Sequence, residues 1–170
     1  MKKIIFLLSL MTISLSNAQD LTVASGALLT IANEGGVYVT GDFENSGTTN
    51  FTSKSDAFGA LIIRGNITAG NDFTYNRYVN IVGSGEWDLI GSPLENASIN
   101  TFVTDNAAAI ATANDGTDTH YALGTYDHVN DIWTNYTSAT VASAGNFDLG
   151  MGYQMATLSG PTLAFNGSMS

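Results

Sequence analysis

The sequence predicts an all-β protein in which a short solenoid-like or open β layer is followed by a jelly-roll-like β-sandwich. Three observations support this fold class. Short runs of β-forming residues alternate with turn signals, the first half of the chain carries a degenerate repeat, and no stretch there shows a sustained apolar period of about 3.6 residues. Helix is therefore a weak competitor in the first half.

The first half of the chain is a series of predicted strands. Segments between them contain Gly, Asn and Ser, for example Asn45-Ser46-Gly47, which are typical of turns. The runs rich in β-forming residues cover 27–31, 37–43, 48–52, 60–67 and 73–79.

A degenerate repeat favours a solenoid for residues 19–80. Val39-Thr40-Gly41-Asp42-Phe43 aligns with Ile63-Arg64-Gly65-Asn66-Ile67 at an offset of 24 residues. This length is about one coil of a β-solenoid, in which a coil buries its apolar face only when a neighbour stacks on it. Two similar hairpins in an antiparallel sheet are the alternative, and two copies alone do not separate them.

The second half of the chain, residues 81–170, is predicted to be the sandwich. Gly83-Ser84-Gly85 marks the boundary before it. Ala107-Ala108-Ala109 has high helix propensity, so one helix is predicted over 106–113, capped by Asp105 or Asn106. Short strands with regular turns are typical of a sandwich, and they are predicted at 121–126, 132–136, 149–155 and 162–165.

Two further expectations concern this second unit. Trp87 and Leu89 share one face of a predicted strand, and Trp87 is expected in the core, where its truncation would cost about 3 to 5 kcal/mol. The strand at 162–165 has no predicted partner after it, so the sandwich is expected to be truncated at its C-terminus and to self-associate through an unpaired edge.

The N-terminus predicts export. Lys2 and Lys3 precede an apolar run over 4–15, and Ser16-Asn17-Ala18 follows it. This order is typical of a secretory signal peptide, residues 1–18, cleaved after Ala18. The run is shorter than the roughly 20 residues that a bilayer core requires, so no membrane span is expected after signal removal. A secreted or cell-surface location follows.

Charge and cysteine content exclude several function classes. Signal removal leaves Lys54, Arg64 and Arg77 as the cations against 15 acidic residues, so the chain lacks the basic patch that nucleic-acid binding requires. The absence of cysteine excludes disulfides and thiolate metal sites. Because 44% of residues are hydrophobic and 12% charged, the chain can bury a core under a surface of Thr, Ser and Asn.

Four landmarks in one order resemble the N-terminal region of large Bacteroidota cell-surface proteins, similar to type IX secretion cargo. The resemblance covers most of the exported chain and implies a surface or adhesion-like role without catalytic residues. Met151 departs from the family's frequent lysine, and the C-terminal sorting domain typical of such cargo is not recognised here. The landmarks are Tyr75-Asn76-Arg77-Tyr78-Val79, Trp87-Asp88-Leu89-Ile90-Gly91-Ser92-Pro93, Gly124-Thr125-Tyr126-Asp127 with Trp133, and Leu149-Gly150-Met151-Gly152-Tyr153.

Candidate chemistry is sparse. His120 and His128 lie near several aspartates, yet their spacing matches no zinc motif, so catalysis is not expected. Asp115 and Asp118 flank Gly116 in a loop whose alternate oxygen side chains suit calcium, with a plain Asx-rich turn as the alternative.

Aromatic residues supply the remaining candidates. Four aromatic residues can form a surface for stacking sugar rings: Trp87, Trp133, Tyr126 and Tyr136. Core or cross-strand packing is the favoured alternative, and Trp87 is its strongest candidate.

The sequence therefore predicts a non-catalytic, structural or adhesion-like module outside the cell. Its expected partner is a surface glycan or another cell-surface protein. The alternatives are a calcium-assisted carbohydrate-binding module and a non-catalytic fragment of a secreted polysaccharide hydrolase.

Overall fold

The computed structural model describes residues 17–69, 72–83, 87–160 and 162–169. Strands predominate among these residues, with one α-helix and one short 3-10 helix, so the predicted all-β class is confirmed. The predicted signal peptide lies outside the described residues except for Asn17 and Ala18. The predicted boundary Gly83-Ser84-Gly85 is described only at Gly83.

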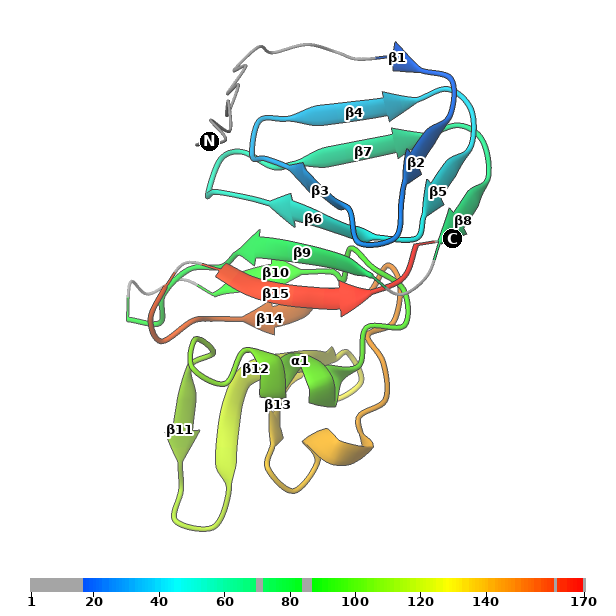
Figure 1. The fold of residues 1–170 in the computed structure, drawn as a ribbon. Helices are drawn as coiled ribbons and strands as arrows, with labels where there is room; N and C mark the ends of the chain where they lie inside the picture. Colours follow the sequence, from blue (N-terminus) through cyan, green and yellow to red (C-terminus); the bar gives the residue numbers. More distant parts are fainter. Residues whose placement is uncertain (1–16, 70–71, 84–86, 161, 170) are drawn as a thin grey trace, which may run out of the picture.

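The first half of the chain winds into a three-sided solenoid whose sides are parallel sheets (Figure 1). The sides are β1-β4-β7, β2-β5-β8 and β3-β6-β9. Val39 pairs with Ile63, so one coil has the 24 residues of the repeat, and parallel pairing favours the solenoid over antiparallel hairpins. The strands are β1 (Asn17–Ala18), β2 (Leu21–Val23), β3 (Leu28–Ile31), β4 (Gly36–Val39), β5 (Phe43–Asn45), β6 (Thr48–Thr52), β7 (Ala60–Ile63), β8 (Ile67–Ala69) and β9 (Phe73–Tyr78).

Apolar side chains fill the interior of the solenoid. The rings of Phe43 and Phe73 lie 6.1 Å apart between centroids, and Phe51 stacks on Tyr75 at 5.2 Å. Each coil covers the apolar row of the next, so stacking supplies the burial that one coil lacks. Buried members of this interior include Val23, Ile31, Val39, Phe43, Phe51 and Phe73.

The repeated motif forms a corner between two sides of the solenoid, and it divides each of the two predicted runs that contain it. A Cβ on Gly65 would lie 2.3 Å from the carbonyl oxygen of Gly41, so glycine is required where the corners stack. The Asp42 carboxylate accepts hydrogen bonds from the backbone N–H and the side-chain amide of Asn66, at 2.8 and 3.2 Å. These bonds tie one corner to the next.

The second half of the chain forms a five-stranded antiparallel sheet beside the solenoid (Figure 1). The order is β10-β14-β12-β11, and β13 also pairs with β12. The predicted strands at 121–126 and 132–136 fall inside β12 and β13, whereas only the end of 149–155 is a strand. The bounds are β10 (Asp88–Ile90), β11 (Thr112–Asn114), β12 (Thr119–Asp127), β13 (Ile132–Thr137) and β14 (Tyr153–Met155).

The helix prediction is wrong in position. The helix is α1 (Ile99–Asp105), and η1 (Val141–Ser143) is the short 3-10 helix. The Ser98 hydroxyl accepts a hydrogen bond from the Thr101 N–H at 3.3 Å and caps the N-terminus of α1. Asn106 ends the helix instead of starting one. Burial of Ile99, Phe102 and Val103 outweighs the alanine propensity of the following residues.

The last strand, β15 (Thr162–Gly167), returns to the solenoid and pairs antiparallel with β9. The sheet order is β15-β9-β6-β3, so this strand of the second half shares a sheet with the first half (Figure 1). No partner was predicted after the strand at 162–165, and the structure pairs this strand with β9, which precedes it in the sequence. The division into 19–80 and 81–170 stays a prediction.

The outer edge of β15 is covered by Asn106. The Ala164 N–H donates to Asn106 Oδ1 at 2.8 Å, and Asn106 Nδ2 donates to the Ala164 carbonyl at 2.9 Å and to the Phe102 carbonyl at 2.8 Å. One side-chain amide therefore satisfies backbone groups that an adjacent strand would otherwise bind. The expected self-association through this edge stays a prediction.

An aromatic core lies between the β15-β9 sheet and the five-stranded sheet. Phe102 of α1 lies 4.6 Å from Phe165 of β15 and 5.2 Å from Phe147. Phe147 also meets Tyr153 of β14 edge to face at 4.9 Å. The core thus fixes the inner face of the five-stranded sheet, whereas the opposite face is buried only in part.

Candidate functional site: the outer face of the five-stranded sheet

Side chains alternate between the two faces of the five-stranded sheet. Leu123, Tyr153 and Met155 lie on the inner face and are at most 1% exposed. The opposite face we call the outer face. Its central row consists of Cα partners on four adjacent strands, and the whole face is defined by Trp87, Leu89, Gly124, Tyr126, Trp133, Asn135 and Gln154.

Two side-chain amides meet at the centre of the outer face. Gly124 of β12 is the Cα partner of both Asn135 on β13 and Gln154 on β14. Gln154 Nε2 donates to Asn135 Oδ1 at 2.5 Å, and a Cβ on Gly124 would lie 2.5 Å from that oxygen. Glycine is therefore required for two strands that are not adjacent to join their side chains across β12.

An aromatic pair lies beside the amides. Tyr126 and Trp133 are Cα partners, and their rings are 5.1 Å apart at an interplanar angle of 51°. The two side chains are 40% and 44% exposed. The Tyr126 hydroxyl donates a hydrogen bond to the Asp131 carboxylate, which raises the pKa of Tyr126. This bond fixes the ring that supports Trp133.

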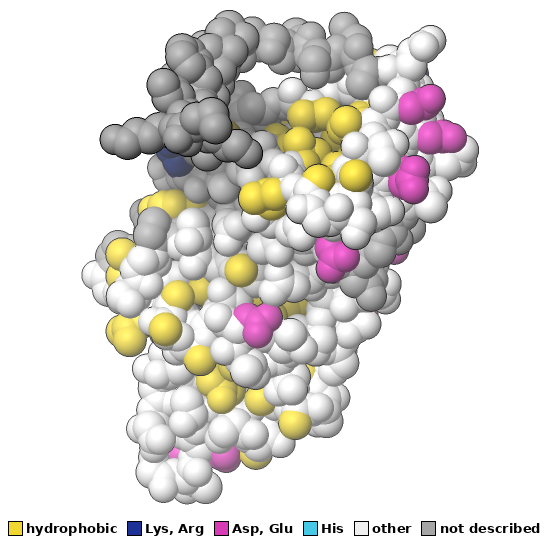
Figure 2. Space-filling model, in the orientation of Figure 1, with side chains coloured by type: hydrophobic (Ala, Val, Ile, Leu, Met, Phe, Trp, Pro, Cys, Tyr) yellow, Lys and Arg dark blue, Asp and Glu magenta, His cyan; other side chains and the backbone are white. Residues whose placement is uncertain are grey.

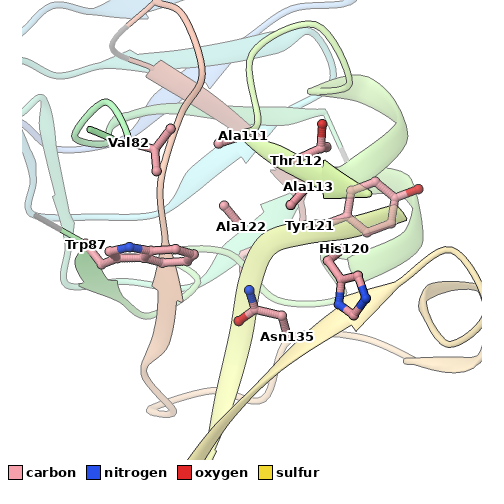
Figure 3. Close-up of a pocket in the computed structure, with 9 residues that line it drawn as sticks. All are labelled: Val82, Trp87, Ala111, Thr112, Ala113, His120, Tyr121, Ala122 and Asn135. Atoms are coloured by element: carbon pink, nitrogen blue, oxygen red, sulfur yellow. The ribbon is translucent and has the colours of Figure 1, made fainter. Parts of the chain in front are cut away.

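Trp87 is on the surface, so its predicted place in the core is wrong. It is 44% exposed, and Leu89 on the same side of β10 is 67% exposed. The predicted shared face exists, but it points to solvent because the inner face is already filled. Trp87 and Val82 line one side of a hollow, His120 lies on the other, and Ala122 and Asn135 lie between them (Figure 3).

Tyr136 does not join the other predicted aromatics. It lies on the inner side of β13, is half-buried, and packs against the core. Burial raises the pKa of its hydroxyl. The structure therefore brings Tyr126 and Trp133 together and separates Tyr136 from them. Sequence reasoning did not find Gln154 and Asn135, although a glycine inside the predicted strand 121–126 was the available signal.

The loop proposed for calcium is a turn closed by its own hydrogen bonds. Asp115 Oδ1 accepts from the Thr117 and Asp118 N–H groups, both at 2.8 Å, and Asp115 Oδ2 contacts His120 Nε2 at 2.9 Å. The Asp118 and Thr117 bonds and the His120 contact hold the pKa of Asp115 below its usual range. Asp118 Oδ1 accepts from the Ser138 hydroxyl at 2.9 Å. The contacts match the Asx-turn alternative.

The remaining candidate groups are dispersed. His120 is the second residue of β12 and His128 follows the end of this strand, so the two imidazoles lie at opposite ends of β12. Among the residues that the structure describes, no three His, Asp or Glu side chains are grouped to hold a metal ion. No helix in the described parts of the chain is long and apolar enough to cross a bilayer.

Comparison with family models, with curated proteins and with solved structures finds no match to this chain. The residues of the outer face are therefore the basis on which a function can be proposed.

Proposed function

We propose that this chain is an exported, non-catalytic, adhesion-like module that binds its partner through the outer face of the five-stranded sheet. The observation that carries the proposal is the exposure of Trp87, Tyr126 and Trp133 on one face of a sheet whose other face is packed. Large aromatic side chains are enriched where proteins bind partners, because they bury much apolar surface while losing little conformational entropy.

The arrangement of the two halves supports this role. The solenoid is closed by backbone ladders on three sides, and β15 joins it to the second half through six pairs of Cα partners. A binding face on a sheet is held more precisely than one on loops. The solenoid would then act as a rigid spacer that holds the outer face away from the cell.

The signal-like N-terminus and the resemblance to type IX secretion cargo support export to the cell surface or beyond it. The non-catalytic part of the proposal is supported by the nature of the outer face. Its exposed aromatic rings, its two neutral amides and its small residues are groups that bind a ligand.

The test is saturable binding of fluorescent protein to intact epithelial cells and intact bacteria, measured by flow cytometry. We expect binding that falls at least tenfold in a Tyr126→Ala/Trp133→Ala double variant. Leu28→Ala is the control, because Leu28 is 64% exposed on the solenoid, far from the outer face in the fold. Equal binding by the double variant, or no saturable binding to either cell type, would overturn the proposal.

A further inference from the structure

We propose that the outer face binds a neutral oligosaccharide that extends across several strands, with Trp87 and Trp133 as stacking surfaces and the Asn135–Gln154 amide pair as the polar centre. This inference rests on the proposed function and names the ligand class of the same face. It is carried by the chemistry of the face, by its length and by its charge.

The side chains of the outer face suit sugar rings because exposed aromatic rings lie beside two amides that keep hydrogen-bonding groups available. A pyranose ring presents apolar C–H groups on its faces and hydroxyls around its edge. Trp87 and Trp133 are each 44% exposed and can cover C–H faces. The hydrogen bond from Gln154 Nε2 to Asn135 Oδ1 leaves the Asn135 amino group as a donor and the Gln154 carbonyl as an acceptor for sugar hydroxyls.

The preorganisation of the amides supports recognition rather than chance exposure. Gln154 and Asn135 are both half-buried and hold each other across Gly124. Their orientation is therefore fixed before a ligand arrives, which lowers the entropic cost of binding. Neither side chain makes another hydrogen bond with the residues that the structure describes.

The centre of the face carries small residues. Gly124 lies beneath the two amides without a side chain, and Ala122 lines the hollow beside Trp87. The hollow beside Trp87 has a volume of about 150 Å³, and Val82 and Ala122 are among the residues that line it (Figure 3). A ring that reaches the amides also meets the exposed side chain of Leu89, the Cα partner of Gln154.

The length of the face indicates more than one sugar ring. Trp133 is the Cα partner of Tyr126, which lies four residues along β12 from Ala122 at the Trp87 hollow. Four residues of a strand span roughly 13 Å. The two tryptophans therefore lie too far apart for one ring to touch both, and an oligosaccharide is required to occupy the whole face.

The charge of the protein favours a neutral ligand. Outside the signal-like segment the cations are Lys54, Arg64 and Arg77, and all three belong to the solenoid half. The formal net charge is -10, and acidic side chains lie on both halves of the molecule in the view of Figure 2. A polyuronate or sulfated glycan would be repelled by this field and would find no guanidinium on the outer face.

The experiment is isothermal titration with neutral gluco-, manno- and xylo-oligosaccharides of one to six rings, with oligouronates of equal length alongside. We expect affinity for at least one neutral series to rise by tenfold or more from one ring to several, and no binding of the oligouronates. Trp87→Ala and Trp133→Ala are each expected to weaken binding by roughly tenfold, the order of one aromatic contact. Gln154→Ala is expected to change the ranking among the neutral sugars.

Matched controls separate recognition from folding. Tyr136→Phe alters the same strand as Trp133 on its inner side, and Leu28→Ala alters an exposed apolar residue of the solenoid; both are expected to leave affinity unchanged. Trp87→Ala is expected to lower the melting temperature only slightly, because close to half of its side chain is exposed.

Three outcomes would overturn the inference: equal affinity for one ring and for several, preference for the oligouronates, or full binding by both tryptophan variants. Cell binding that depends on Trp133 but is abolished by protease treatment of the cells, with no sugar bound, would identify a protein partner. The proposed function would then stand and the inference would fail. If the unmodified protein shows no saturable binding to cells and binds no sugar, both the proposed function and the inference fail.

Discussion

The solenoid and the five-stranded sheet bury their cores by different means. In the solenoid, equivalent residues such as Val39 and Ile63 stack in adjacent coils, so the same pattern of buried positions recurs in each coil. In the second half, Phe102, Phe147 and Phe165 come from a helix, a loop and the last strand. The recurring pattern can be recognised in the sequence as a repeat of fixed length. The core of the second half depends on contacts between segments that lie far apart in the sequence.

Two buried asparagines show the same contrast. Asn106 in the second half forms hydrogen bonds through its amide to two backbone segments. Asn45 in the solenoid is 3% exposed, and its side chain makes no hydrogen bond with the described residues; the hydroxyl of Thr49, fully buried, makes none either. Buried polar groups without partners reduce stability, so Asn45 and Thr49 are positions at which substitution can stabilise the solenoid.

The largest expected effect tests whether the two halves unfold together. Phe43 is fully buried in the solenoid, and Phe43→Ala is expected to lower the free energy of unfolding by about 3 to 5 kcal/mol. Both tryptophans lie in the second half, so their fluorescence reports only that half. Because β15 pairs with β9, we expect the fluorescence midpoint in urea to fall with the circular-dichroism midpoint. An unmoved fluorescence midpoint would mean that the halves unfold independently.

Removal of the Asn106 amide is the next largest change. Asn106→Leu leaves the Ala164 N–H and carbonyl and the Phe102 carbonyl without their side-chain partner, and we expect a loss of about 2 to 4 kcal/mol in urea unfolding. Asn100→Ala on the exposed side of α1 is the matched control and should cost well under about 1 kcal/mol. A neutral Asn106→Leu variant would show that apolar packing replaces the amide.

Substitutions of two threonines on β6 are expected to change stability in opposite directions. They sharpen the comparison between buried polar groups with and without hydrogen-bond partners. The buried hydroxyl of Thr49 has no hydrogen-bond partner among the described residues. Thr49→Val keeps the shape of the side chain and removes this hydroxyl, so we expect it to stabilise the protein by about 1 kcal/mol. Thr52→Val is expected to destabilise by a similar amount, because Thr52 Oγ1 accepts a hydrogen bond from the Asn33 N–H at 2.9 Å. Thermal melts of the two variants check both signs. Destabilisation by Thr49→Val would reveal a bound partner for its hydroxyl.

The smallest expected effect is confined to the β11–β12 turn. The bonds from Asp118, His120 and Thr117 lower the pKa of Asp115 from its ordinary value of 3.8, so the turn is fully stabilised above that pH and loses this contribution as the pH falls further. We expect the Thr117 and Asp118 amide signals in NMR spectra to shift only in this acidic range, and Asp115→Asn to remove the shift. A midpoint at or above 3.8 would contradict the assignment.

The sequence was sufficient for the features that repeat locally. The strands of the solenoid, its coil length and the strands β12 and β13 follow from β-forming runs, glycines and spacing. The place of Trp87 did not follow, because alternation shows that Trp87 and Leu89 share a face but not which face meets the core. The pairing of β15 with β9 and the amide contact across Gly124 join residues far apart in sequence, and no local signal specifies such partners.

The ladder between β9 and β15 has a consequence for how this protein can vary. Tyr78 and Thr162 are direct Cα partners, so the intervening chain leaves the solenoid and returns to it at one point. Segments whose two ends meet in this way are tolerated as insertions, because the host needs only a short connection between its strands. The segment between Tyr78 and Thr162 is therefore placed as an insertion between two paired strands. Its length and its solvent-exposed residues can vary while the backbone ladder of the solenoid is kept.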